Sequence, residues 1–144
     1  MNEEELKNYP ELQDIEIPPE IYLDSDLRII DQLLFGIIRN ICLSNIDGCC
    51  WSSNKHFAIL LDTSSEDISK SIENLIECGW IDTEPVDVED ERLKRRISIN
   101  HPQVQAEIAR RTTEKLLEEY EKQEERTNWY TLNFEELLKY FPQY

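Results

Sequence analysis

Cysteine and histidine are the residues of this chain whose spacing most directly tests for metal or thiol chemistry. Cys42, Cys49, Cys50 and Cys78 contain no C-x-x-C pair, and the neighbours Cys49 and Cys50 would point to opposite faces of a strand. A metal site would need His56 to complete its ligand set. The spacing instead favours buried or edge thiols in a reducing compartment, so we expect no bound metal.

Catalytic patterns are also absent from the sequence. His56 and His101 are the only histidines, and neither has a serine, cysteine or carboxylate partner at an interpretable spacing. Gly36, Gly48 and Gly79 are too widely separated for a phosphate-binding loop. Acidic residues are numerous enough for a two-carboxylate site, but they fall on predicted solvent faces. We therefore expect neither an enzyme nor a cofactor.

The net charge of the chain limits which molecules it can bind. Fifteen Lys and Arg stand against 31 Asp and Glu, which gives a formal net charge of −16. Such a charge favours solubility and repels polyanions at long range, so nonspecific DNA binding should be poor. The one basic cluster follows an acidic stretch at 82–91 and consists of Arg92, Lys94, Arg95 and Arg96.

Targeting signals are not evident in the sequence. No apolar run approaches the roughly 18 residues that a membrane span needs. The first residues, MNEEELKNYPELQ, lack the basic start and apolar centre of a signal peptide. We expect a cytoplasmic protein with no membrane partner.

The length predicts one domain with appendages. Residues 1–22 hold three prolines among acids and no sustained period, which predicts an extended, solvated acidic arm. Apolar residues from Leu27 to Leu43 then recur at three- and four-residue steps, which predicts a central core helix with Asp24 or Asp26 as its N-cap.

The stretch from 57 to 81 carries the clearest structural pattern, with a brief strand predicted before it at 49–51. Its apolar residues fit two short helices joined by a tight turn at 62–65. Ser52 or Ser53 can cap the first helix and Ser64 the second, and Gly79 ends the second. Strands at 80–84 and 93–99 would follow as a hairpin, which is the arrangement of a helix-turn-helix with a wing.

The C-terminal part is predicted to be helical. Asn100 or His101, followed by Pro102, should open a long charged helix over 100–127, which packs on a partner, crosses the domain surface or forms a homodimer through residues 103–126. Its heptad is too irregular to predict a coiled coil. Asn133 should cap a separate aromatic-rich terminal helix within 128–144. That tail either folds back on the core or docks on another protein.

The run from Cys49 to Ile81 resembles the winged helix-turn-helix domains of phage and plasmid replication proteins of the replisome-organiser type. The resemblance covers about residues 23–99 and includes Phe57-Ala58, Ser64, Ile68, Ile72, Leu75 and Gly79 in register. It implies a mainly α fold with a small β-hairpin wing, and a role in replication initiation or gene regulation. Departures occur at Asp62, where such domains usually have Gly, and at Glu66 and Asp67, where they often have Arg or Lys and Thr.

In the resembling proteins the outer face of the second helix enters the DNA major groove. Here this face contains several neutral or basic polar residues, and the wing adds the basic cluster. The candidate contacts to double-stranded DNA are therefore Ser65, Ser69, Lys70, Asn74, Arg92, Lys94, Arg95 and Arg96. The cluster could equally pair with the acids at 87–91 across the hairpin.

The same helix face also carries carboxylates, which oppose phosphate contacts. They suggest a second function, a protein-binding module such as a phage-encoded inhibitor of a host nucleic-acid enzyme. Its partner would be a host or phage protein with a basic DNA-binding cleft. Its candidate contacts are Glu66, Glu73, Glu77, Trp129, Tyr130, Phe134, Tyr140 and Phe141.

Overall fold

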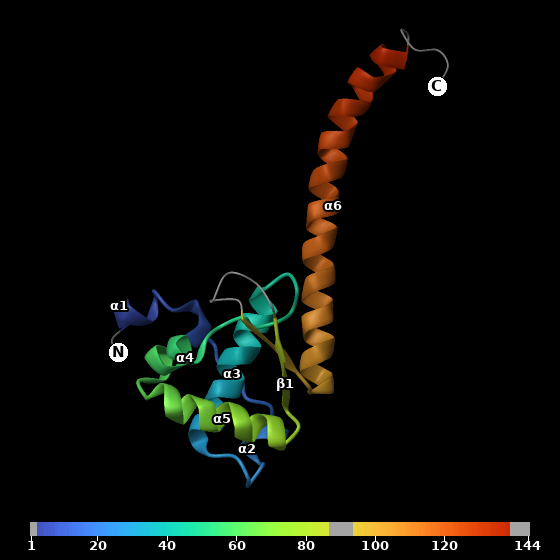
Figure 1. Cartoon of the computed structure of the whole chain (residues 1–144). Coiled ribbons are helices and arrows are strands. Elements are labelled where there is room, and N and C mark those ends of the chain that lie inside the picture. The colour runs from blue at the N-terminus through green and yellow to red at the C-terminus, as the bar shows by residue number, and fades with distance from the viewer. Residues whose placement is uncertain (1–2, 87–93, 139–144) are drawn as a thin grey trace.

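The protein is described by a computed structural model that covers residues 3–86 and 94–138. Three short helical segments come first, followed by a long core helix, two further helices, a hairpin and a very long last helix (Figure 1). In chain order these elements are α1 (Glu3–Leu6), the 3-10 turn η1 (Pro10–Leu12), α2 (Pro19–Tyr22), α3 (Ile29–Ser44), α4 (Asn54–Leu61), α5 (Ser65–Glu77), β1 (Ile81–Pro85), β2 (Arg95–Ile99) and α6 (Pro102–Leu138).

Helices α4 and α5 form the predicted helix-turn-helix. The Ser53 hydroxyl accepts the His56 backbone N–H at 3.2 Å, and the Ser64 hydroxyl accepts that of Asp67 at 3.1 Å. Both serines are thus N-caps, as predicted. Asp62 takes the left-handed conformation at the end of α4, with φ 51°. Aspartate tolerates this conformation better than most residues, so the fold accepts it where glycine is usual.

The hairpin that follows is the predicted wing. Gly79, with φ 80°, turns the chain out of α5 into β1. Strand β1 pairs with β2 in antiparallel register, with Ile81 opposite Ile99. The predicted brief strand before α4 is reduced to a single bridge between Cys50 and Ile97, joined by two hydrogen bonds of 2.8 Å.

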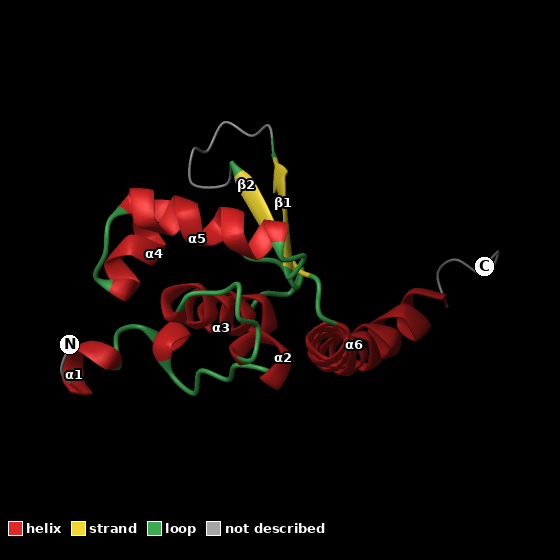
Figure 2. Ribbon diagram, turned by 90° about the horizontal axis from the view of Figure 1, so that it is seen from below, coloured by secondary structure: helices red, strands yellow, loops and turns green. Residues whose placement is uncertain are grey.

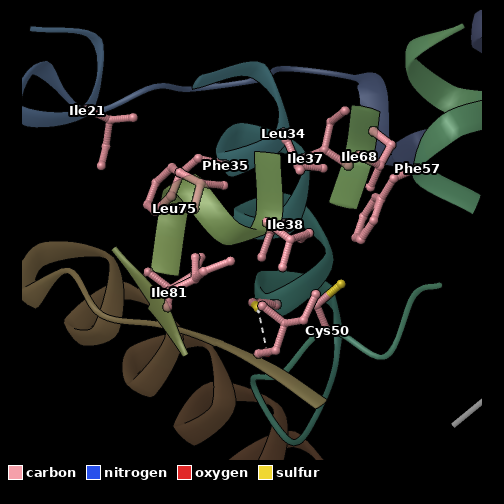
Figure 3. Packing of buried hydrophobic residues seen from close by; sticks show 14 of the residues in the cluster. Ile21, Leu34, Phe35, Ile37, Ile38, Cys50, Phe57, Ile68, Leu75 and Ile81 are labelled. Atoms are coloured by element: carbon pink, nitrogen blue, oxygen red, sulfur yellow. Dashed lines mark hydrogen bonds between the residues drawn. The ribbon is translucent and has the colours of Figure 1, made fainter. Parts of the chain in front are cut away.

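The core surrounds α3, which lies beneath α4 and α5 (Figure 2). Figure 3 shows side chains from the arm, α3, α4, α5 and β1 meeting there. Fully buried members include Ile21, Leu34, Phe35, Ile37, Ile38, Phe57, Ile68, Leu75 and Ile81. The N-cap predicted for α3 is wrong, because Arg28 occupies that position. Asp24 instead accepts hydrogen bonds from the Asp26 backbone and the Trp80 indole.

The expectation of an extended, solvated N-terminal arm is also wrong. The arm makes three short helical segments and packs along α3, and Ile21 at its end is fully buried in the core. Tyr9, Leu12, Ile15 and Ile17 pack against the same core. The prolines stop a long helix, but the isolated apolar residues between them are sufficient to cover one side of α3.

The last helix begins as predicted and ends differently. His101 Nδ1 accepts the Val104 backbone N–H at 3.3 Å, which caps the helix behind Pro102. The separate terminal helix is wrong, because α6 runs without a break to Leu138. Neither glycine nor proline interrupts residues 103–141, so a cap at Asn133 cannot compete with continuous helical hydrogen bonding. Up to residue 138 the chain projects away from the domain and does not fold back (Figure 1).

The fold is mainly α-helical with a two-stranded antiparallel hairpin, a winged helix followed by a C-terminal helix, as expected. In the part of the chain that the structure describes, no helix combines the length and apolarity that a membrane span requires.

Candidate nucleic-acid interface

The second helix of the helix-turn-helix, α5, has one buried face and one open face. Ile68, Ile72 and Leu75 face the core, and Ser64 and Gly79 set the two ends of the helix. Because this inner stripe fixes the helix against α3 and α4, the opposite face is held in a defined orientation toward solvent.

The open face of α5 is more acidic than basic. Ser65, Lys70 and three glutamates at positions 66, 73 and 77 are exposed, and Ser69 is half-buried. One lysine therefore stands among three carboxylates on the surface that would face DNA. The glutamates predicted as partner contacts therefore share one face with Ser65, Ser69 and Lys70, which were predicted as DNA contacts.

Asn74, one of the residues predicted to contact DNA, makes a contact inside the protein. Its side-chain amide donates to Asp31 Oδ2 of α3 at 3.0 Å. Arg28 binds the same carboxylate through its side chain, with an Nη2–Oδ1 distance of 3.0 Å, and also reaches Ser71 on α5 at 2.9 Å. A polar cluster therefore joins the start of α3 to the side of α5.

Asp31 is the centre of this cluster and is fully buried. Burial alone would raise the pKa of Asp31, but hydrogen bonds from Ser71, the Arg28 backbone and Asn74 outweigh it and hold the pKa below its ordinary value. The Arg28 guanidinium also pairs with Asp67 at 2.9 Å and lowers the pKa of that carboxyl group. The buried carboxylate is thus charged and fully engaged at neutral pH.

Sequence reasoning did not find the Arg28–Asp31 cluster. Two features of the sequence pointed to it. Asp31 lies on the same helical stripe as Leu27 and Leu34, and Ser71 lies on the stripe that contains the buried Ile68 and Leu75. A polar residue on each of two facing apolar stripes indicates that the two residues meet.

The two described arginines of the basic cluster on the wing make contacts within the protein. Arg96 pairs with Glu84, its cross-strand neighbour on β1. Arg95 turns toward the start of α4, where it donates to Asn54 Oδ1 at 2.7 Å and to the Ser52 carbonyl at 2.8 Å. Burial lowers the pKa of Arg95, and its Nε has no hydrogen-bond partner among the described residues.

Lys94 is exposed at the edge of the wing, and Arg92 lies outside the described residues. The acids at 87–91 that were predicted to pair with this cluster lie outside the described residues, and the described partner of Arg96 is Glu84 on β1. Each of the two described wing arginines, Arg95 and Arg96, uses its guanidinium in a contact within the protein.

Of the aromatic residues predicted to bind a partner, positions 129, 130 and 134 belong to the distal part of α6, which projects away from the domain (Figure 1). Tyr140 and Phe141 lie outside the described residues. The described part of α6 therefore does not return to the acidic face of α5 within one chain.

Two of the cysteines are buried in the core, and His56 contacts the N-terminal arm. Cys42 and Cys50 are buried, and burial raises the pKa of both thiols, which suppresses their reactivity. His56 Nε2 lies 3.1 Å from a Glu11 carboxylate of the arm. The metal-type grouping found among residues 3–86 and 94–138 is Asp24, Asp26 and Cys78, which does not include His56.

Taken together, a helix-turn-helix, an open second helix and a flanking hairpin define a winged helix-turn-helix protein.

No protein-family model matches the chain, and no curated protein matches it. Among solved structures, the transcriptional regulator Tm0710 from Thermotoga maritima is similar over 83% of this chain and 82% of its own, with 12% identity and a TM-score of 0.41. A point mutant of Lactococcus lactis ZitR is similar over 93% of each chain, with 19% identity and a TM-score of 0.40.

Proposed function

We propose that this chain is a winged-helix DNA-binding protein, a non-enzyme that recognises a specific duplex site through the open face of α5. The proposal rests on how α5 is held in the domain. Its inner stripe and the Asp31 cluster hold it rigidly, while its outer face is open beside the wing. A helix presented in this way fits the major groove.

The contacts to DNA would be few and specific. Ser65 and Ser69 can exchange hydrogen bonds with base edges or phosphates, and Lys70 at the middle of the face can reach a phosphate or a guanine. The surrounding glutamates oppose nonspecific phosphate contacts and can accept from cytosine amino groups. This composition suits a protein that binds one site and releases other DNA, as replication initiation or gene control by a phage or plasmid would require.

A selection from a random duplex library at low ionic strength tests the proposal. We expect one enriched sequence, bound more weakly by Lys70→Ala than by the wild type. Lys122→Ala is the matched control, because it removes the same charge from an exposed site on α6, far from α5. Failure to enrich any duplex, or an equal effect of the two substitutions, would contradict the proposal.

A second function is favoured by one observation, the three exposed glutamates on α5 beside a wing whose described arginines contact the protein itself. In this alternative the face binds a basic DNA-binding cleft of another protein. Replacing Glu66, Glu73 and Glu77 together by Gln distinguishes the two. The DNA-binding function predicts tighter duplex binding by the variant, whereas the protein-binding function predicts loss of the partner and no gain for DNA.

A further inference from the structure

The turn between α2 and α3 carries large apolar side chains that are open to solvent. Tyr22, Leu23 and Ile29 are 54%, 69% and 76% exposed, whereas side chains of this kind are usually inside a domain. Ile21 and Leu27 on either side of the turn are buried in the core. The turn is therefore fixed to the domain and presents its three exposed side chains in a defined place.

Hydrogen bonds bring these side chains together on one surface. The Leu27 backbone N–H donates to the Asp24 carbonyl at 3.2 Å, so the chain reverses direction between these two residues. The reversal returns the start of α3 to the end of α2, where the Gln32 amide donates to the Tyr22 carbonyl at 3.2 Å (Figure 2). Ile29 lies one helical turn before Gln32 and faces the same side of α3. The resulting surface, the α2–α3 patch, consists of Tyr22, Leu23 and Ile29.

Two carboxylates of the same turn border the patch. Asp24 Oδ2 accepts the Trp80 indole N–H at 2.8 Å, and Asp26 is exposed beside it. Hydrogen bonds from Trp80 and from the Asp26 backbone lower the pKa of Asp24, so this carboxyl group is charged at neutral pH. Carboxylate oxygens of both residues lie within 4.8 Å of the Cys78 sulfur; burial raises the pKa of that thiol, and the two charges raise it further. The border of the patch is therefore negative.

The base in this turn is already matched by other acids. Arg28 pairs with Asp31 at 3.0 Å and with Asp67 at 2.9 Å, and both partners lie away from the patch border in the polar cluster between α3 and α5. Helix α5 ends beside Asp24 and Asp26 without a basic residue in its last turn, and its terminal carbonyls add partial negative charge. An occupant that complements this surface has apolar side chains at its centre and cations at its edge.

The charge of the border distinguishes between the possible occupants. A second copy of this chain carries the same net charge of −16, and DNA and anionic membranes are also negative, so all three are repelled at long range. We propose that the α2–α3 patch binds a segment of another protein in which apolar residues are flanked by Lys or Arg, such as one face of an amphipathic helix. The patch shares no residue with the open face of α5, so its binding can succeed or fail independently of the proposed function.

A selection of displayed random peptides on the immobilised full chain, without DNA, tests the proposal. We expect the enriched peptides to combine apolar residues with Lys or Arg, and Ile29→Ser to weaken the tightest one at least about tenfold. Ile46→Ser is the matched control, because Ile46 is 60% exposed just beyond the other end of α3, a helix about 24 Å long. Circular dichroism confirms that both variants are folded. No enrichment, enriched peptides without basic residues, or an effect of Ile29→Ser no larger than that of Ile46→Ser would overturn the proposal.

The acidic border is tested with the same peptide. Asp26→Asn should weaken its binding about threefold, and this loss should shrink as salt screens the attraction. Glu118→Gln removes the same charge from the exposed surface of α6 and should change the affinity little. Equal effects of the two substitutions would mean that the border does not select the occupant, which contradicts the proposal.

The other occupants are tested with the chain alone. Sedimentation equilibrium measures self-association, and flotation with phosphatidylcholine vesicles measures membrane binding. We expect neither process to depend on Ile29. Dimerisation or vesicle binding that Ile29→Ser abolishes would mean that a second copy or a membrane covers the patch, and would overturn the proposal.

Discussion

The side-chain amide of Asn74 donates a 3.0 Å hydrogen bond to the buried carboxylate of Asp31, and this contact joins the open helix α5 to the core helix α3. The same carboxylate accepts from the backbone and guanidinium of Arg28. A directional polar contact specifies the rotation of a helix more strictly than apolar packing does. The orientation of the face that would meet DNA therefore depends on one buried aspartate.

Replacing Asp31 should destabilise the protein strongly. Asp31→Ala leaves Arg28, Ser71 and Asn74 without their common acceptor, and each buried donor left unsatisfied costs about 1–3 kcal/mol. Urea unfolding followed by circular dichroism measures the loss in free energy of unfolding. Asp67→Ala is the control on the same arginine. Because Asp67 is partly exposed, we expect it to cost less than about 1 kcal/mol, and equal losses would contradict the central role of Asp31.

The contribution of Asp31 should depend on pH in a defined direction. Its pKa is lowered in the folded protein, so the carboxylate stabilises the fold above its ordinary pKa of about 3.9 and stops doing so as the pH falls through its folded value. We compare wild type with Asp31→Asn, because the comparison cancels the general repulsion of a chain with charge −16. The difference in free energy of unfolding should be constant from about pH 8 to about pH 5 and shrink below about pH 4. A difference that persists unchanged at about pH 2 would exclude the charged carboxylate as its source.

The helix-turn-helix and the wing could be predicted from the sequence because local signals agree there. Ser53, Ser64 and Gly79 mark helix ends within a few residues of apolar stripes, and tertiary structure did not override them. The arm and the tail were mispredicted for the opposite reason. Ile21 is one apolar residue among acids and prolines, and its burial depends on packing against core residues that are distant in the sequence, including those of α3.

The candidate site was predicted only in part for a similar reason. Helical spacing correctly placed Lys70 on the open face, but it could not distinguish Asn74, at the edge of that face, from a solvent-facing residue. That distinction depends on Asp31, 43 positions earlier in the chain. For Arg95 and Arg96, a cluster of basic residues in the sequence does not reveal which side chains turn inward.

The packing of the arm gives a further prediction. Ile21→Ala removes a fully buried side chain and should lower the free energy of unfolding by about 2–4 kcal/mol. Leu23→Ala is the matched control, since Leu23 lies two residues away and is 69% exposed, and we expect less than about 0.5 kcal/mol. Thermal and urea unfolding of both variants measure the effect. Equal small losses would mean that the arm does not belong to the core.

The acidic face of α5 gives the prediction that bears most directly on function. Glu73 lies one turn from Lys70 on the exposed face, so in a DNA complex its carboxylate would approach the phosphates that Lys70 contacts. A unit charge about 4 Å away in water contributes about 1 kcal/mol, so Glu73→Gln should bind the selected duplex about fivefold more tightly. Glu118→Gln removes the same charge from the exposed surface of α6 and should change the affinity little. Fluorescence anisotropy at several salt concentrations measures both affinities, and the gain for Glu73→Gln should diminish as salt screens the repulsion.

Weaker duplex binding by Glu73→Gln would mean that this carboxylate itself contacts a base, for example by accepting from a cytosine amino group. Identical affinities for both variants and the wild type would mean that α5 does not face DNA.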